Sequence, residues 1–158
     1  MESARVGYSI TPLYISTSSV KKLILRNNQL YSFIGPICNF TNLQFLDLSG
    51  NRATDISAYV FGALPSLQHL GLDNNILGSS EIFNTVDSKE IFENQTNLVF
   101  LNMSSNRLSI LFKDFFWRST KLKHLYLDHN LLVDWNVTIE HMKDLEILDI
   151  SWNQILYL

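Results

Sequence analysis

An eleven-residue phrase recurs six times along the 158-residue chain, and it limits the possible folds more than any other feature. Written as a pattern, the phrase is L-x-x-L-x-L-x-x-N-x-L. Its copies occupy residues 20–30, 43–53, 67–77, 98–108, 122–132 and 145–155. A phrase repeated in one register indicates stacked structural units, each burying its apolar face against its neighbours. The chain is therefore expected to form a solenoid.

Positions 4 and 6 of each phrase carry large aliphatic residues, with leucine in every copy except for Met103 and Ile150. Side chains alternate along a strand, so a spacing of two places both residues on one face. Each phrase thus predicts a strand of about three to five residues. The six strands are expected to pair in parallel, with positions 2, 3, 5, 7 and 8 facing solvent on the concave side.

Position 9 is asparagine in every copy. An amide offers two N–H donors and one carbonyl acceptor, so it can satisfy backbone groups where the chain leaves the strand. We expect these asparagines to form a structural ladder and to contact no ligand. They are Asn28, Asn51, Asn75, Asn106, Asn130 and Asn153.

The segments between the phrases return along the opposite, convex side, which we expect to be irregular or to contain short helices. A large apolar residue occurs six positions before each phrase, and this column predicts a second buried spine. Its members are Tyr14, Ile37, Phe61, Phe92, Phe116 and Ile139. Together these features predict an α/β solenoid, curved and with short parallel strands on its concave face.

The domain division follows the phrases. Residues 1–19 are interpreted as the tail of a preceding repeat or a degenerate N-terminal segment, and residues 20–158 as six repeats. Successive asparagines are 23, 24, 31, 24 and 23 residues apart, so the third unit is about seven residues longer. The extra residues fall near 78–88 and form either a specialised binding loop or a neutral one. The final phrase is expected to lack a C-terminal cap, as in a piece of a longer protein.

The concave side carries the candidate binding residues, because aromatic side chains are common interface anchors. Alternatively, these aromatic residues only cover neighbouring side chains, or they face the next repeat in a longer array. Protonation of His69, His124 and His129 near pH 6 would add positive charge to this side, although histidine is also an ordinary surface residue. The candidates are Phe45, Asp47, His69, Phe100, His124, Tyr126, Asp149 and Trp152.

Four N-x-S/T sequons provide candidate N-glycosylation sites at Asn39, Asn94, Asn102 and Asn136. Three of them fall on return segments, where a glycan would be tolerated. Asn102 instead occupies position 5 of the concave sheet. A glycan there would block part of that surface, so either this residue is unmodified or the binding face lies elsewhere.

Net charge, apolar runs and the cysteine count exclude several classes of function. A net charge of −3 gives no nucleic-acid signal, and no apolar run approaches the ~20 residues that span a membrane. No signal peptide is visible at the N-terminus. The single cysteine, Cys38, cannot form an internal disulfide and is expected to be a buried small side chain, or else an intermolecular thiol. We expect no enzyme activity, no metal and no cofactor, because neither a catalytic trio nor a phosphate-binding glycine loop occurs.

The phrase followed by x-x-x-x-x-F-x-x-L resembles the typical class of leucine-rich repeat. The copies LQFLDLSGN, LVFLNMSSNRL and LEILDISWNQI look like the ectodomain repeats of Toll-like receptors, and the resemblance covers residues 20–158. It implies a receptor of innate immunity that binds a protein or microbial ligand, often as a dimer, on the extracellular or endosomal side of a membrane.

Two other interpretations stay open. One is a leucine-rich repeat adhesion or scaffold module that mediates protein–protein interaction outside innate immunity. The other is a repeat region attached to a kinase. The plant version of that arrangement usually has a Gly-x-Ile-Pro turn, which is absent after each asparagine here.

Overall fold

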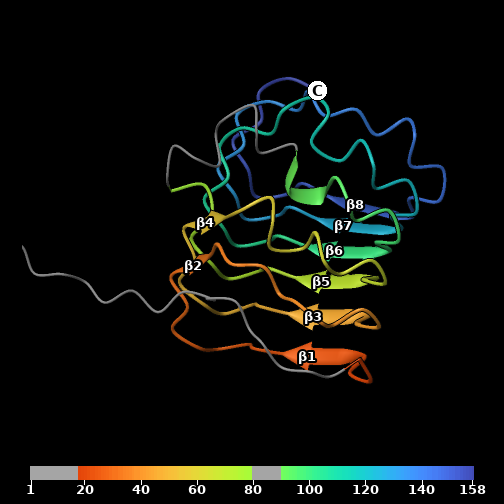
Figure 1. Cartoon of the computed structure of the whole chain (residues 1–158). Coiled ribbons are helices and arrows are strands. Elements are labelled where there is room, and N and C mark those ends of the chain that lie inside the picture. Colours follow the sequence, from red (N-terminus) through yellow and green to blue (C-terminus); the bar gives the residue numbers. More distant parts are fainter. Residues whose placement is uncertain (1–17, 80–89) are drawn as a thin grey trace, which may run out of the picture.

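A computed structural model describes residues 18–79 and 90–158 of the chain. Its main feature is a six-stranded parallel sheet whose strands follow the chain order from bottom to top in Figure 1. Each repeat contributes one three-residue strand. These are β1 (Lys22–Ile24), β3 (Phe45–Asp47), β5 (His69–Gly71), β6 (Phe100–Asn102), β7 (His124–Tyr126) and β8 (Ile147–Asp149). The predicted leucine-rich repeat solenoid is therefore confirmed.

The register shows why the phrase repeats. Position 4 of each copy pairs with position 4 of the next, as in the pair Leu46 and Leu70 between β3 and β5. The same register holds across the long third unit, where Leu70 pairs with Leu101. Equivalent residues therefore stack in columns at the strand spacing of about 4.8 Å. Residues at the same position of successive phrases therefore form one continuous row along the sheet.

The aliphatic columns form the core. Leu46, Leu48, Leu70 and Leu72 are fully buried, as positions 4 and 6 require. In the last repeat, the position-4 residue Leu148 is only partly buried. The middle repeats of the described chain thus bury most of the hydrophobic side chains. Each of them is stabilised mainly by its contacts with the repeat on either side.

The predicted convex spine is also present. Ile37, Phe61, Phe92 and Phe116 are at most 1% exposed, while Ile139 is partly buried and Tyr14 lies outside the described residues. The rings of Phe61, Phe92 and Phe116 stack at successive centroid distances of 6.0 Å. Phe115 packs edge-on against this stack, with its centroid 4.8 Å from that of Phe116. Packed aromatic rings thus form the buried layer beneath the return segments.

A second, two-stranded parallel sheet was not predicted. It pairs β2 (Ser32–Phe33) with β4 (Asp55–Ile56), just after the asparagine step of the first two repeats. Among the described residues, no further strand joins it. In the third repeat the chain turns at Gly78 instead, with φ of +91°. A Cβ at Gly78 would lie 2.5 Å from the carbonyl oxygen of Arg107, so a residue without a side chain is needed there.

The convex side is irregular rather than helical. Within the described chain, helical backbone is limited to a 3₁₀ turn over residues 90–92, at the start of the green region in Figure 1. Most of the predicted loop 78–88 lies outside the described residues. None of the helices in the described part of the chain is long and apolar enough to cross a membrane. Cys38 is half-buried, so the prediction of a fully buried thiol is wrong.

Candidate binding surface

The asparagines determine how the backbone leaves each strand. Asn106 donates hydrogen bonds from its Nδ2 to the carbonyl oxygens of Leu72 and Met103, each at 3.0 Å. Its Oδ1 accepts a hydrogen bond from the N–H of Leu77, also at 3.0 Å. One amide therefore joins its own strand exit to the preceding repeat. Asn51, Asn75, Asn130 and Asn153 repeat this pattern.

Asn28 differs from the other members of the ladder. It is exposed, and within the described residues its side chain donates to the carbonyl oxygens of Leu25 and Arg26 in its own repeat. Asn51, Asn75, Asn106 and Asn130 are 4–7% exposed. These amides are fully used inside the solenoid, so they have no spare groups for a ligand.

The residue before each asparagine has a left-handed backbone. The φ angles at position 8 lie between 52° and 64°, which side chains other than glycine and asparagine rarely adopt. The row was predicted on the concave side, but its conformation was not predicted. The available signal was the asparagine or glycine in the first three repeats, Asn27, Gly50 and Asn74. The row consists of Asn27, Gly50, Asn74, Ser105, His129 and Trp152.

Position 3 forms a row of stacked rings on the concave side. Phe45 stacks on His69, and His69 stacks on Phe100, with centroid distances of 6.0 Å in both pairs. The ammonium group of Lys22 lies 4.2 Å from the centroid of Phe45 and extends the row at one end. His124 meets Phe100 edge-on at the other end. The four half-buried rings therefore cover one another and also present a continuous aromatic ridge.

Tyr126 joins this ridge from position 5, with its ring 5.6 Å from that of Phe100. Its strand, β7, follows β6 in the sheet. Four of the predicted candidates, Phe45, His69, Phe100 and Tyr126, thus form one contiguous surface, and His124 borders it.

Two acidic candidates have local partners. Asp47 accepts hydrogen bonds from the N–H and the Oγ–H of Ser49 and pairs with Arg26, whose Nε is 3.1 Å from its Oδ2. Asp47 is only 6% exposed, and these partners compensate its buried charge. Asp149 accepts the same two bonds from Ser151, and these bonds hold the pKa of Asp149 below its usual range. Both aspartates therefore stabilise the backbone just after the strand by bonding the serine two residues later.

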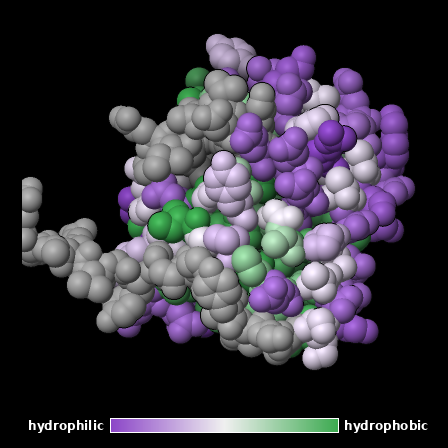
Figure 2. All heavy atoms as spheres, in the orientation of Figure 1, coloured by the Kyte–Doolittle hydropathy of each residue, from purple (hydrophilic) through white to green (hydrophobic). Residues whose placement is uncertain are grey.

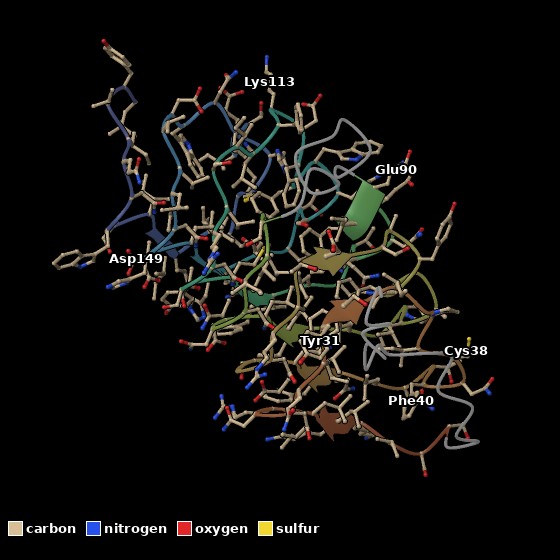
Figure 3. All side chains as sticks on the ribbon, turned by 90° about the vertical axis from the view of Figure 1, so that its left-hand side faces the viewer. Tyr31, Cys38, Phe40, Glu90, Lys113 and Asp149 are labelled. Atoms are coloured by element: carbon tan, nitrogen blue, oxygen red, sulfur yellow. The ribbon has the colours of Figure 1, made fainter. Side chains whose placement is uncertain are left out.

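The C-terminal end of the surface is the most exposed. Trp152 is 76% exposed, and its ring stacks on that of His129 at 5.3 Å. Nδ1 of His129 is 2.9 Å from Oδ2 of Asp128. Figure 3 shows Asp149 at this end of the sheet, on the opposite side of the molecule from Cys38 and Glu90. Trp152 is thus a large apolar side chain available to a partner on the concave side.

A surface ion pair lies beside this end. Lys123 donates a hydrogen bond to Glu146 at 3.0 Å, which raises the pKa of Lys123 and lowers that of Glu146. His124 Nε2 lies 3.7 Å from the same carboxylate. Glu146 was not among the predicted site residues, because a single acidic residue at position 2 carries no signal until the sheet places it beside Lys123 and His124. Among the described residues, no group of His, Cys, Asp or Glu has the geometry of a metal site.

A hollow of about 260 Å³ opens in the middle of the sheet above Gly71. Gly71 leaves a gap in position 5 between Asp47 and Asn102, its neighbours on β3 and β6. The ridge residues Phe45, His69 and Phe100 border the hollow on one side, and Arg26 and Asp73 border it on the other. Neither Gly71 nor Asp73 was among the predicted site residues, because an absent side chain and an isolated acid are not conspicuous in a sequence.

The sequons fall on two different surfaces. Asn39, Asn94 and Asn136 are exposed on the return segments. Asn102 is half-buried in β6, where its Oδ1 accepts a hydrogen bond from the N–H of Ser104. In Figure 2, hydrophilic residues gather along the right-hand side of the molecule, which is the side of the large sheet. Hydrophobic residues are visible nearer the middle of this view. Glycans on the three exposed sites would leave the concave surface open.

The leucine-rich repeat model matches residues 18–77 and 83–132, which together make up more than half of the chain. The chain belongs to the leucine-rich repeat family. Toll-like receptor 4 of Pinctada imbricata is 32% identical over 89% of this chain, and human podocan-like protein 1 is 26% identical over 89%. The glycosylated Toll–Spatzle complex of Drosophila contains a chain with a TM-score of 0.72 and 31% identity over 87% of this chain.

The matches cover only part of each relative. The chain spans 16% of Toll-like receptor 4, 31% of podocan-like protein 1 and 19% of the matched chain in the Toll complex. The resemblance to Toll-like receptor repeats is confirmed by the first and third of these matches. The chain is thus a protein-binding region made of leucine-rich repeats. Similar repeats also occur in proteins other than Toll-like receptors, such as podocan-like protein 1.

Proposed function

We propose that the chain is a ligand-recognising region of a Toll-type receptor of innate immunity, placed on the extracellular or endosomal side of a membrane. It binds a protein or microbial ligand through its concave surface, and the complete receptor works as a dimer. The aromatic ridge with exposed Trp152 is the observation that carries this proposal. Similarity to Toll-like receptor 4 and to Toll supports the receptor class.

The concave surface suits a partner for two reasons. First, its aromatic ridge is held rigid by stacking, so little conformational entropy is lost when a ligand covers it. Second, aromatic residues near the centre of an interface contribute a large share of the binding energy. Loop 78–88 is proposed as a second contact, because insertions in repeat proteins often carry binding residues.

The test compares two equally exposed side chains on opposite surfaces. Trp152 and Tyr59 are both 76% exposed, but Tyr59 belongs to a return segment. Trp152→Asn keeps a residue that tolerates the left-handed backbone, since Asn27 and Asn74 occupy the same position in other repeats. Tyr59→Ala is the matched control.

The chain is secreted from insect cells and tested by biolayer interferometry against lipopolysaccharide, peptidoglycan, β-glucan and a panel of secreted proteins. A ligand of the concave surface should lose at least tenfold in affinity to Trp152→Asn and be unaffected by Tyr59→Ala. The proposal is wrong if the Tyr59 variant weakens binding while the Trp152 variant does not.

A leucine-rich repeat adhesion or scaffold module outside innate immunity is the second candidate. Similarity over 89% of the chain to podocan-like protein 1, which is not named as a Toll-like receptor, supports it. This alternative predicts binding to extracellular-matrix extract and no binding to the microbial probes. The same immobilised chain serves for both measurements, so the two functions are separated directly.

A further inference from the structure

We infer that the hollow above Gly71 receives the side chain of an arginine exposed on a protein partner. This inference rests on the proposed use of the concave surface. It adds the chemistry of one contact, at a place three strands away from Trp152.

The charge balance favours a single cation. Arg26 compensates Asp47, as its Nε is 3.1 Å from Asp47 Oδ2 and 2.9 Å from Oγ of Ser49. Asp73 has no such partner, because its only side-chain contact in the described residues is the hydrogen bond that Asn74 donates to its Oδ2 at 2.8 Å. One negative charge is therefore left at the border of the hollow, with a free Oδ1.

Two carboxylate oxygens converge over the glycine. A Cβ built on Gly71 would lie 3.2 Å from Oδ1 of Asp47 and 3.7 Å from Oδ1 of Asp73. These oxygens come from successive repeats, yet they face the same empty volume. Oδ1 of Asp47 already accepts hydrogen bonds from the N–H and the Oγ–H of Ser49, so the open acceptor is Oδ1 of Asp73. A planar guanidinium can donate to Asp73 and extend its remaining N–H groups over Asp47, whereas a lysine ammonium is a compact and strongly hydrated point charge. The geometry therefore favours arginine over lysine.

The apolar border suits the rest of the side chain. Arginine carries a three-carbon stem that packs against apolar surface while its charged end reaches polar groups. Phe45, His69 and Phe100 line the hollow together with Asp73. The stem would lie along this ridge with the guanidinium over Gly71. The inner rows agree with a basic partner, since positions 5 and 7 contain four aspartates against one arginine. These residues are Arg26, Asp47, Asp73, Asp128 and Asp149.

The test uses N-acetyl-arginine methylamide as the probe, titrated into the ¹⁵N-labelled whole chain and followed by two-dimensional NMR. The neutral isostere N-acetyl-citrulline methylamide is the matched probe, and the lysine derivative is a third. We expect saturable shifts at the amides of Gly71, Asp73 and Asn102 with the arginine probe. The lysine probe should bind at least threefold more weakly, and the citrulline probe should cause no saturable shift.

Asp73→Asn keeps the size of the side chain and removes its charge, so the fold is retained and visible in the same spectra. It should weaken arginine binding at least tenfold. Asp128→Asn changes the same position two repeats later, where Tyr126 rather than glycine occupies position 5. This control should bind like the wild type.

Equal shifts from the arginine and citrulline probes would overturn the inference, as would no shift at Gly71 or wild-type binding by Asp73→Asn. Such a failure would not affect the Trp152 comparison, which probes a different part of the concave surface. Conversely, binding of the arginine probe without any effect of Trp152→Asn on a partner would leave the hollow as a site and remove the wider proposal.

Discussion

The interior and the concave surface of the solenoid follow opposite rules. Inside, one residue type makes the same contacts in repeat after repeat, as the amides of Asn75 and Asn106 do. On the surface, the same position changes from Asp47 to Gly71 to Asn102 along three paired strands. The interior thus stabilises any repeat, whereas the surface is particular to this chain. Function should depend on the second set, and stability on the first.

The largest expected effect is in the convex spine. Phe92 is 1% exposed and contacts Phe61, Phe115 and Phe116. Phe92→Ala would leave a cavity at the centre of this stack and should lower the free energy of unfolding by about 3–5 kcal/mol. Urea denaturation followed by circular dichroism measures the loss. Tyr59→Ala on the exposed return surface should cost less than about 0.5 kcal/mol, and a similar loss in both variants would contradict the comparison.

The asparagine ladder gives the next effect. Asn106→Ala removes one acceptor and the donors to three carbonyl oxygens, all buried within the turn. Leaving such groups unpaired should lower the free energy of unfolding by roughly 2–4 kcal/mol. Asn28→Ala, at the exposed member of the ladder, should cost less than about 1 kcal/mol. If the two variants are equally stable in urea, the ladder is not the source of turn stability.

Trp152 should separate binding from stability. Asparagine relieves the left-handed backbone strain at this position but loses the stacking on His129. We therefore expect the melting temperature of Trp152→Asn to stay close to that of the wild type, within about 1 kcal/mol of stability. Differential scanning fluorimetry provides the check. A strongly destabilised variant would place Trp152 with the interior and not with the surface.

The smallest effect concerns acid. Ser151 lowers the pKa of Asp149 in the folded chain, so the folded state binds fewer protons there than the unfolded state. The resulting stability is fully present above the ordinary aspartate pKa of about 3.9 and is lost as the pH falls through the lowered value. Ser151→Ala should reduce this acid sensitivity. Because the pair is exposed, the change should be well under 1 kcal/mol between about pH 5 and 3. A larger acid sensitivity in Ser151→Ala than in the wild type would show that the sign is wrong.

The same contrast explains what could be predicted from the sequence. The strands, the spine and the asparagine columns each appear six times, so their spacing alone indicates their structure. Within residues 18–79 and 90–158, the pairing of β2 with β4 occurs in only two repeats and has no comparable pattern in the sequence. The hollow depends on a missing side chain at Gly71 and on the pairing of Arg26 with Asp47 across two repeats. Such single-copy features become visible only when the register places their residues side by side.

The most direct test of the account is a map of glycan occupancy at the four sequons. The chain is secreted from mammalian cells, and its glycopeptides are analysed by mass spectrometry. If the concave sheet is the recognition surface, glycans should occupy exposed Asn39, Asn94 and Asn136, and Asn102 should be bare. A glycan on Asn102 would stand over the hollow beside Gly71 and contradict the use of this surface for binding.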